Sequence, residues 1–385
     1  MGRKRQSGKL PSSSANPKSV ERERSGASDR VALTPSALHR WLTARGEPRY
    51  REQQILGWVY RDDAVSFADM SNVPRALREA LEEHFRIVRP EPVAVARSQD
   101  DTRKLLFRFE RGAEVETVII PDPPRLTLCV SSQAGCGMGC RFCATAQLGL
   151  RRNLSAAEIL AQVTGARRLL RPTERLTNIV FMGMGEPLAN YDNLVEAIQV
   201  LTAEWGFALS GRRITVSTVG LVPQMERLVR ETPVQLAVSL TATTDELRSE
   251  LMPINRRYPL TQLVAACRRL PLPQRRRITF EYVLLAGVND RAADAERLCT
   301  LLRGLRAKVN LIPFNPFPGA PYRRPEESEV RRFQEALLQS GLHATVRRSR
   351  GVDVQAACGQ LALANRSEAP VQDQADPSAH QVPAA

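Results

Sequence analysis

The feature that most constrains the fold is a regular alternation of short β-branched runs with helix-length amphipathic segments. The runs lie at 125–130, 177–182, 213–217, 235–239, 277–284 and 308–313, and the helical stretches at 155–170, 192–203, 222–231, 260–269, 289–305 and 326–340. Six strand–helix units in series predict a parallel sheet or barrel. Because ligands of such α/β folds lie at the carboxyl ends of the strands, we expect the functional site there.

The residues before this alternation follow two other patterns. Thr34 and Pro35 predict the start of a helix, and apolar stripes up to Phe85 predict a small helical domain. Residues 93–121 alternate as in a two- or three-stranded meander. Both ends of the chain carry too few apolar residues to form a core. The expected division is a disordered basic arm (1–30), a helical domain (31–90), a β meander linker (91–122), an α/β core (123–362) and a disordered tail (363–385).

The charge balance predicts a polyanionic partner. The formal net charge is +14, and 50 of the 55 basic residues are Arg, which matches phosphate with a planar fork. A nucleic acid or an anionic membrane face would satisfy this excess. The candidate phosphate contacts are the clusters at 151–152, 212–213, 275–277 and 347–348.

Location follows from what the sequence contains. It has no apolar stretch of about 18 residues and no apolar segment after the basic N-terminus, so we expect neither a membrane span nor a secretory signal. The seven cysteines, an odd number without an export signal, argue against a secreted disulfide framework. A cytoplasmic protein without membrane contact is expected.

Three clustered cysteines carry the strongest chemical signal. Cys136, Cys140 and Cys143 form a C-x3-C-x2-C pattern in the loop after the first core strand. Three thiolates among glycines can wrap one face of a [4Fe–4S] cluster and leave one iron open for substrate chemistry, whereas electron-transfer clusters take four thiolates. Zinc is the structural alternative, but it requires a fourth Cys or His, and none follows within forty residues.

Four stretches together resemble the RlmN family of bacterial RNA methyltransferases. They are LCVSSQAGCGMGCRFCATAQ at 128–147, GMGEP at 183–187, LIPFNPFPGAPY at 311–322 and AACGQ at 356–360. The resemblance covers about 33–362. It implies an α/β fold, a partial (βα)6 radical S-adenosylmethionine (SAM) barrel, with an N-terminal helical accessory domain that binds RNA and a small β meander.

The resemblance also implies a reaction. The substrates would be adenosines of 23S rRNA, in the peptidyl-transferase centre, and of tRNA next to the anticodon, both methylated at C2. Adenine C2 is an electron-poor carbon without a useful lone pair, so a carbon radical rather than polar transfer is required. The cofactors would be one [4Fe–4S] cluster and SAM, with two SAM per turnover and an electron donor such as flavodoxin or ferredoxin.

The resemblance assigns roles to individual residues. Cys358 would carry a methyl group, Cys129 would resolve the RNA adduct by forming a disulfide with Cys358, and Glu116 would be the general base. The expected SAM contacts are Gly185, Glu186, Ser217, Ser239, Leu240, Thr241 and Asn315, where Thr241 stands in place of the family's usual His. Without the resemblance, Cys129 is more typical of a thiol buried in a strand, and Glu116 of an outward-facing strand residue. The polar residues at the strand ends, Ser217, Ser239 and Asn315, are then more typical of turns.

Two other functions are compatible with these motifs. A Cfr-type enzyme, which methylates adenine C8 of 23S rRNA and confers antibiotic resistance, shares the cysteines. The Ala-Thr-Ala-Gln stretch at 144–147 is more similar to RlmN, since Cfr-type chains tend to have Thr-Gly there. A non-catalytic RNA-binding protein with zinc or a vestigial cluster would need neither Cys358 nor Glu116.

Overall fold

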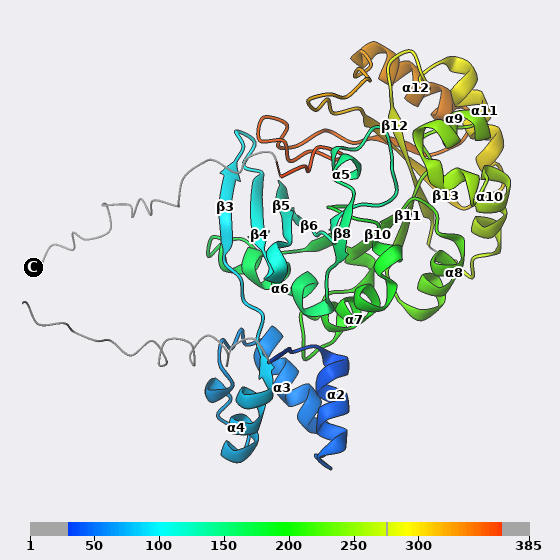
Figure 1. Ribbon diagram of the computed structural model, residues 1–385. Helices are drawn as coiled ribbons and strands as arrows, with labels where there is room; N and C mark the ends of the chain where they lie inside the picture. The colour runs from blue at the N-terminus through cyan, green and yellow to red at the C-terminus, as the bar shows by residue number, and fades with distance from the viewer. Residues whose placement is uncertain (1–29, 275, 364–385) are drawn as a thin grey trace, which may run out of the picture.

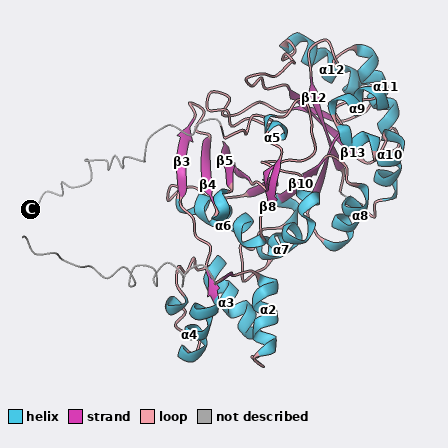
Figure 2. Cartoon of the chain, in the orientation of Figure 1, coloured by secondary structure: helices cyan, strands magenta, loops and turns pink. Residues whose placement is uncertain are grey.

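The computed structural model describes residues 30–274 and 276–363 (Figure 1). The predicted arm and tail, apart from residues 30 and 363, lie outside the described residues, as does Arg275. A small helical domain at the N-terminal end adjoins a larger α/β body (Figures 1 and 2). No helix within the described residues is both long and apolar enough to cross a membrane.

The helical domain contains α2 (Pro35–Ala44), α3 (Tyr50–Tyr60) and α4 (Arg75–His84), with the 3-10 turn η1 (Phe67–Asp69) between α3 and α4. The Thr34 side chain accepts a hydrogen bond from the backbone of Ala37 at 3.2 Å, which begins α2 as the sequence predicts. Two short parallel strands, β1 (Val31–Ala32) and β2 (Phe85–Arg86), close the domain.

The body is built on one ten-stranded sheet in the order β14-β13-β12-β11-β10-β9-β6-β5-β4-β3. Its strands are β3 (Pro92–Arg97), β4 (Arg103–Arg108), β5 (Glu114–Asp122), β6 (Arg125–Cys129), β9 (Asn178–Phe181), β10 (Ile214–Thr218), β11 (Gln235–Ser239), β12 (Ile278–Leu284), β13 (Ala307–Pro313) and β14 (Ala344–Val346). Strands β6 and β9 to β14 pair in parallel, which confirms the expected partial barrel.

The meander is not separate from this sheet. Strands β3, β4 and β5 pair antiparallel and continue the barrel sheet, because β5 also pairs with β6. Val118 of β5 lies directly opposite Cys129 of β6. Directly paired residues face the same side and alternate residues share a face, so Glu116 lies on the same face as Cys129.

Helices cover the outside of the barrel (Figure 1). They are α6 (Ala156–Arg168), α7 (Tyr191–Thr202), α8 (Val222–Glu231), α9 (Asp245–Leu251), α10 (Leu260–Arg269), α11 (Ala292–Leu302) and α12 (Glu327–Gln339). Short elements lie in the connections: η2 (Glu110–Gly112), β7 (Gln133–Gly135), α5 (Ala144–Gln147), β8 (Leu150–Asn153), η3 (Pro187–Asn190), η4 (Gly211–Arg213) and η5 (Pro253–Arg256). The core lies between the sheet and these helices.

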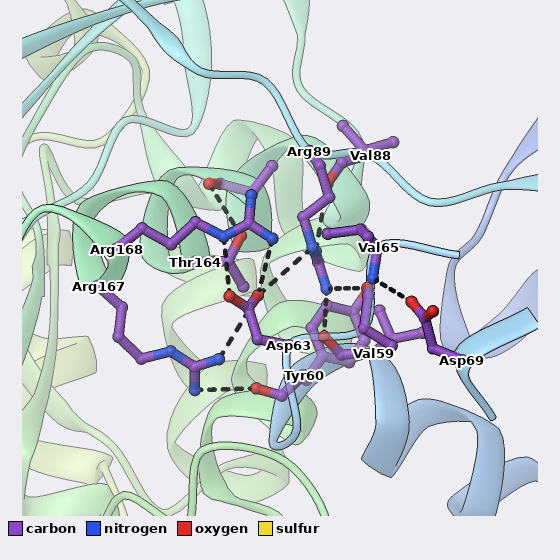
Figure 3. Close-up of polar contacts among 12 residues, drawn as sticks. Val59, Tyr60, Asp63, Val65, Asp69, Val88, Arg89, Thr164, Arg167 and Arg168 are labelled. Atoms are coloured by element: carbon purple, nitrogen blue, oxygen red, sulfur yellow. Dashed lines mark hydrogen bonds and ion pairs between the residues drawn. The ribbon is translucent and has the colours of Figure 1, made fainter. Parts of the chain in front are cut away.

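One carboxylate joins the helical domain to the body. Asp63, just after α3, pairs with Arg168 of α6 at 2.8 Å, with Arg89 at 3.5 Å and with Arg167 at 3.6 Å (Figure 3). Arg167 also donates to the backbone carbonyl of Tyr60 at 3.1 Å. Arg167 and Arg168 of α6 therefore tie the body to this carboxylate, and Arg89 of the N-terminal part joins the same ion-pair cluster.

Candidate active site

The three clustered cysteines lie on a tight loop between β7 and α5. The β7–β8 hairpin brings the backbone of Gly135 so close to Gly149 that an added Cβ would lie 1.8 Å from the Gly149 carbonyl oxygen. Gly135 also has φ of +74°, which favours glycine. The backbone N–H of Cys136 donates to the same carbonyl at 3.0 Å. Glycine at 135 therefore allows the loop to start where it does.

The three thiols lie within electrostatic reach of one another. Burial raises the pKa of the Cys140 thiol well above its usual value, and the nearby thiols of Cys143 and Cys136 raise it further. Burial likewise raises the pKa of Cys136 to about 11. Within the described residues, no group of three or more His, Cys, Asp or Glu side chains is arranged so that it could hold a metal ion. The donor set, three thiols on a loop that contains glycines, nevertheless fits an iron–sulfur cluster in its chemistry.

A cavity of about 150 Å³ lies beside this loop, at the carboxyl ends of β9 to β13. Five of the seven predicted SAM residues border it, together with Cys143 and Cys358; these five are Gly185, Glu186, Ser217, Ser239 and Asn315. The structure therefore brings together five predicted SAM residues that are up to 130 positions apart in the chain. This is the edge at which the strand–helix alternation places a ligand.

The other two predicted SAM residues do not border this cavity. Leu240 is fully buried in the hydrophobic core. Thr241 is also fully buried, with φ of +58°, and its backbone carbonyl accepts a hydrogen bond from Asn289 at 2.6 Å. Its hydroxyl has no hydrogen-bond partner among the described residues. The position where the resembling family usually has His thus holds a buried, unpaired hydroxyl.

Glu186 is held in place by backbone groups. Its carboxylate accepts hydrogen bonds from the N–H of Val219 at 2.9 Å and of Leu188 at 3.0 Å. Burial raises the pKa of Glu186 to about 7, although these hydrogen bonds lower it. The preceding Gly185 has φ of +100°, and a Cβ there would lie 2.6 Å from the Cβ of Gln133. Only glycine fits at this turn.

Two buried charged residues at this edge were not predicted from the sequence. Glu281, 6% exposed, borders the same cavity and accepts a hydrogen bond from the Ser217 hydroxyl at 2.5 Å. The signal for it was present, since a Glu inside the apolar run of β12 is unusual. Arg248 is completely buried and donates to the carbonyls of Ser239, Leu240 and Val219. Its surroundings in α9 are charged, so the local pattern does not distinguish it.

A much larger cavity of about 1170 Å³ fills the barrel interior. Cys129 and Cys358 both border it, and Cys358 also borders the smaller cavity. Burial raises the pKa of the Cys129 thiol to about 12, the Cys358 thiol adds to this rise, and the positive charge of Arg347 opposes it. All seven cysteines are free thiols in this structure. The two cysteines that the sequence pairs therefore share one cavity as separate thiols.

The segment that carries Cys358 is tied to both the cysteine loop and the end of β13. Asn315 donates to the Cys358 carbonyl at 3.1 Å, and the backbone of Ala144 donates to the Gly359 carbonyl at 2.7 Å. The Thr145 hydroxyl donates to the Leu361 carbonyl at 2.6 Å. These contacts hold Cys358 between the two cavities.

Glu116 lies deeper than a surface base would. Its side chain forms an ion pair with Lys104 at 2.9 Å and accepts a hydrogen bond from the backbone of Leu363 at 3.3 Å. Lys104 also donates to the carbonyl of Gln355 at 3.5 Å. Glu116 borders neither cavity, and its carboxylate and the ammonium group of its partner Lys104 contact the backbone of the segment 351–363 through Leu363 and Gln355. It is therefore not the outward strand residue that local pattern alone favours.

Comparison with known proteins identifies this arrangement. Residues 31–87 match the ribosomal RNA large subunit methyltransferase N-terminal domain, and residues 130–299 match the radical SAM superfamily. A protein of Geobacter sulfurreducens described as dual-specificity RNA methyltransferase RlmN is 52% identical, covering 86% of this chain and 91% of the relative. The chain belongs to the RlmN family.

Other members of the RlmN family and a solved structure agree. A protein of Halorhodospira halophila with the same description is 50% identical, covering 88% of this chain and 94% of its own length. The crystal structure of a radical SAM methyltransferase from Sphaerobacter thermophilus is 51% identical with a TM-score of 0.79, covering 86% of this chain and 97% of that one. The RlmN-family resemblance and the expected fold are thereby confirmed.

Proposed function

We propose that this chain is a radical SAM RNA methyltransferase that methylates C2 of adenosine in 23S rRNA and in tRNA next to the anticodon. Membership of the RlmN family supports the RNA substrates and the reaction class. The observation that carries the proposal is the position of Cys358, which borders both the small cavity at the strand ends and the large cavity in the barrel. We place the enzyme in the cytoplasm, with a flavodoxin or ferredoxin as electron donor.

The small cavity is the proposed SAM site. Cys136, Cys140 and Cys143 would hold a [4Fe–4S] cluster, which when bound supplies the electron that cleaves SAM to a carbon radical. Among the described residues Glu186 accepts hydrogen bonds from the backbone of Val219 and Leu188 and from the Thr218 side chain. A carboxylate offers about four lone-pair sites, so Glu186 can also accept from the methionine ammonium. Asn315 already donates to the Cys358 carbonyl and so orients that segment beside the ligand.

The two cysteines of the large cavity divide the remaining work. Cys358 would carry the methyl carbon and become joined through it to adenine C2. Once the C2 proton has left, the Cys129 thiolate attacks the Cys358 sulfur and forms the S–S bond. The bond from that sulfur to the carbon breaks, and the carbon keeps its electron pair and takes up a proton to become the methyl group on C2. Attack requires a thiolate. Arg347 supports it, because its charge lowers the pKa of the Cys129 thiol against the effect of burial.

Glu116 is the proposed acceptor of the C2 proton. Its carboxylate lies on the same face of the sheet as Cys129 but beneath the segment 351–363. That segment also carries Cys358. Movement of the Cys358 segment away from Glu116 would therefore uncover the carboxylate at the stage at which a proton must leave.

Identification of the methylated nucleoside tests this proposal. The reconstituted enzyme is incubated without oxygen with SAM, a reductant and protein-free 23S rRNA or tRNA, and the digested nucleosides are separated by mass spectrometry. We expect 2-methyladenosine, and none with Cys358→Ala. Detection of 8-methyladenosine alone would support the Cfr-type reaction instead. A protein that holds stoichiometric zinc without sulfide and methylates nothing would support the non-catalytic alternative.

A further inference from the structure

The large cavity runs through the barrel from one edge of the sheet to the other. It begins at residues where the parallel strands start, such as Asn178, Gln235 and Lys308, and reaches Cys358 beyond their far ends. Its volume of about 1170 Å³ exceeds the roughly 300–1,000 Å³ of pockets that take one small molecule. A ligand larger than SAM is therefore suited to it.

The wall of this cavity is polar, although barrel interiors are usually packed with Val, Ile and Leu. Five polar residues on five different strands border it: Thr127, Thr215, Gln235, Thr279 and Asn310. Each is partly exposed, and none of these side chains forms a hydrogen bond with any described residue. Five unpaired hydroxyl and amide groups around one cavity are free to bind a polar ligand.

The charges at the cavity are almost all of one sign. Seven basic residues border it, namely Arg125, Arg212, Arg276, Lys308, Arg347, Arg348 and Arg350, against one acidic residue, Asp122. Asp122 is already paired with Arg125 at 2.5 Å and Arg350 at 3.7 Å.

Three of the seven basic residues remain available for a ligand. Arg212, Lys308 and Arg348 are exposed and make no ion pair or hydrogen bond with the described residues. Arg276, by contrast, donates to the Pro233 carbonyl. Arg212 lies just before β10 and Lys308 at the start of β13. Arg348 follows the carboxyl end of β14, at the opposite edge, where the cysteine loop and the small cavity also lie.

We propose that the RNA enters the barrel from the edge where the parallel strands begin and crosses the polar lumen to Cys358, with Arg212, Lys308 and Arg348 as phosphate contacts. The inference rests on the proposed function. RNA and SAM then approach Cys358 from opposite edges of the sheet. The occupant is a single-stranded segment with unstacked bases, the form in which proteins read RNA sequence, and the five unpaired side chains contact its sugars and base edges.

The phosphate contacts are tested by the salt dependence of binding. The triple variant Arg212→Gln, Lys308→Gln, Arg348→Gln is titrated with a fluorescent RNA stem–loop that bears an unpaired adenosine, at several NaCl concentrations. Each lost contact lowers the slope of log K against log salt by about 0.7 for single strands, so we expect a fall of about 2. The matched control Arg303→Gln, Arg331→Gln, Arg332→Gln removes the same charge from exposed positions outside the cavity and should keep the wild-type slope.

The lumen is tested by Thr279→Val and Asn310→Leu, which remove polar groups that bind no described residue. Both variants should keep the wild-type melting temperature and bind the stem–loop at least several-fold more weakly. An unchanged slope in the triple variant, or unchanged affinity in both lumen variants, overturns the inference.

Two further results separate this inference from the proposed function. If the wild type binds RNA with the expected slope but forms no methyladenosine, the proposed function is wrong and the proposed RNA path through the large cavity is retained. If the wild type methylates RNA while the triple variant keeps the wild-type slope, only the proposed RNA path through the large cavity is wrong. A polyglutamate peptide that competes with the RNA, and loses its own binding in the triple variant, would overturn RNA as the specific occupant.

Discussion

Lys104→Met leaves the Glu116 carboxylate buried without its cation. The side chains of Lys104 and Glu116 are 4% and 3% exposed and lie 2.9 Å apart, so neither charged group can reach solvent. Removing one partner of a buried ion pair costs about 3–5 kcal/mol, whereas replacing both is often close to neutral. The Leu363 N–H still donates to Glu116, so we expect the lower value, a loss of about 3 kcal/mol in the free energy of unfolding.

A double-mutant cycle in urea, read from the unfolding transition of the α/β body, provides the assay. Lys104→Met with Glu116→Gln removes both charges and should recover most of the loss. Arg75→Met is the control, since Arg75 and Glu79 are 85% and 60% exposed, and it should cause no measurable change. A free energy of unfolding for Lys104→Met within about 0.5 kcal/mol of the wild type would contradict a buried ion pair, because such a value is typical of an exposed pair. A double variant as unstable as the single one would refute it too.

Three further perturbations have defined outcomes. Gly185→Ala should weaken SAM binding in calorimetry, because its Cβ would lie 2.6 Å from that of Gln133; an unchanged Kd would contradict this. Alkylation of Cys129 should speed up about tenfold per pH unit from pH 7 to 10, since its pKa is about 12 and only the thiolate reacts. Arg347→Met should slow this alkylation, and an alkylation rate independent of pH would contradict the raised pKa of Cys129. Asp63→Asn should increase proteolysis near residues 88–92 by releasing Arg168, and wild-type resistance would argue against that ion-pair cluster as the domain clamp.

Much of the barrel could be predicted because its signals are local. The parallel strands are β-branched runs bounded by polar residues, and α8 and α10 begin and end where their apolar periodicity does. Strand β14 has only three residues and pairs with β13 through contacts more than 30 positions apart, so no local pattern indicates it. The elements of the cysteine loop, α5 and the β7–β8 hairpin, are likewise too short for a periodic signal.

The residues of the site also differ in how far the local sequence predicts them. Gly185 and Glu186 lie in the loop that follows β9, and the end of that strand is visible in the sequence. The environment of Glu116 is not visible in the sequence, because Lys104 lies on the neighbouring strand β4 and Leu363 is 247 positions away in the chain. Thr241 also follows a strand end, but its side chain is fully buried and does not border the small cavity, which the local pattern does not indicate.

A trapped adduct tests most directly that Cys358 and Cys129 act as the thiol pair of an RNA methyltransferase. Cys129→Ala is incubated without oxygen with SAM, reductant and RNA, then digested with nuclease and protease and analysed by mass spectrometry. We expect a nucleotide mass on the peptide that contains Cys358, because no second thiol can attack the Cys358 sulfur and release the RNA. The same mass should be absent when Cys358→Ala is added. Normal turnover by Cys129→Ala without any adduct would contradict this expectation.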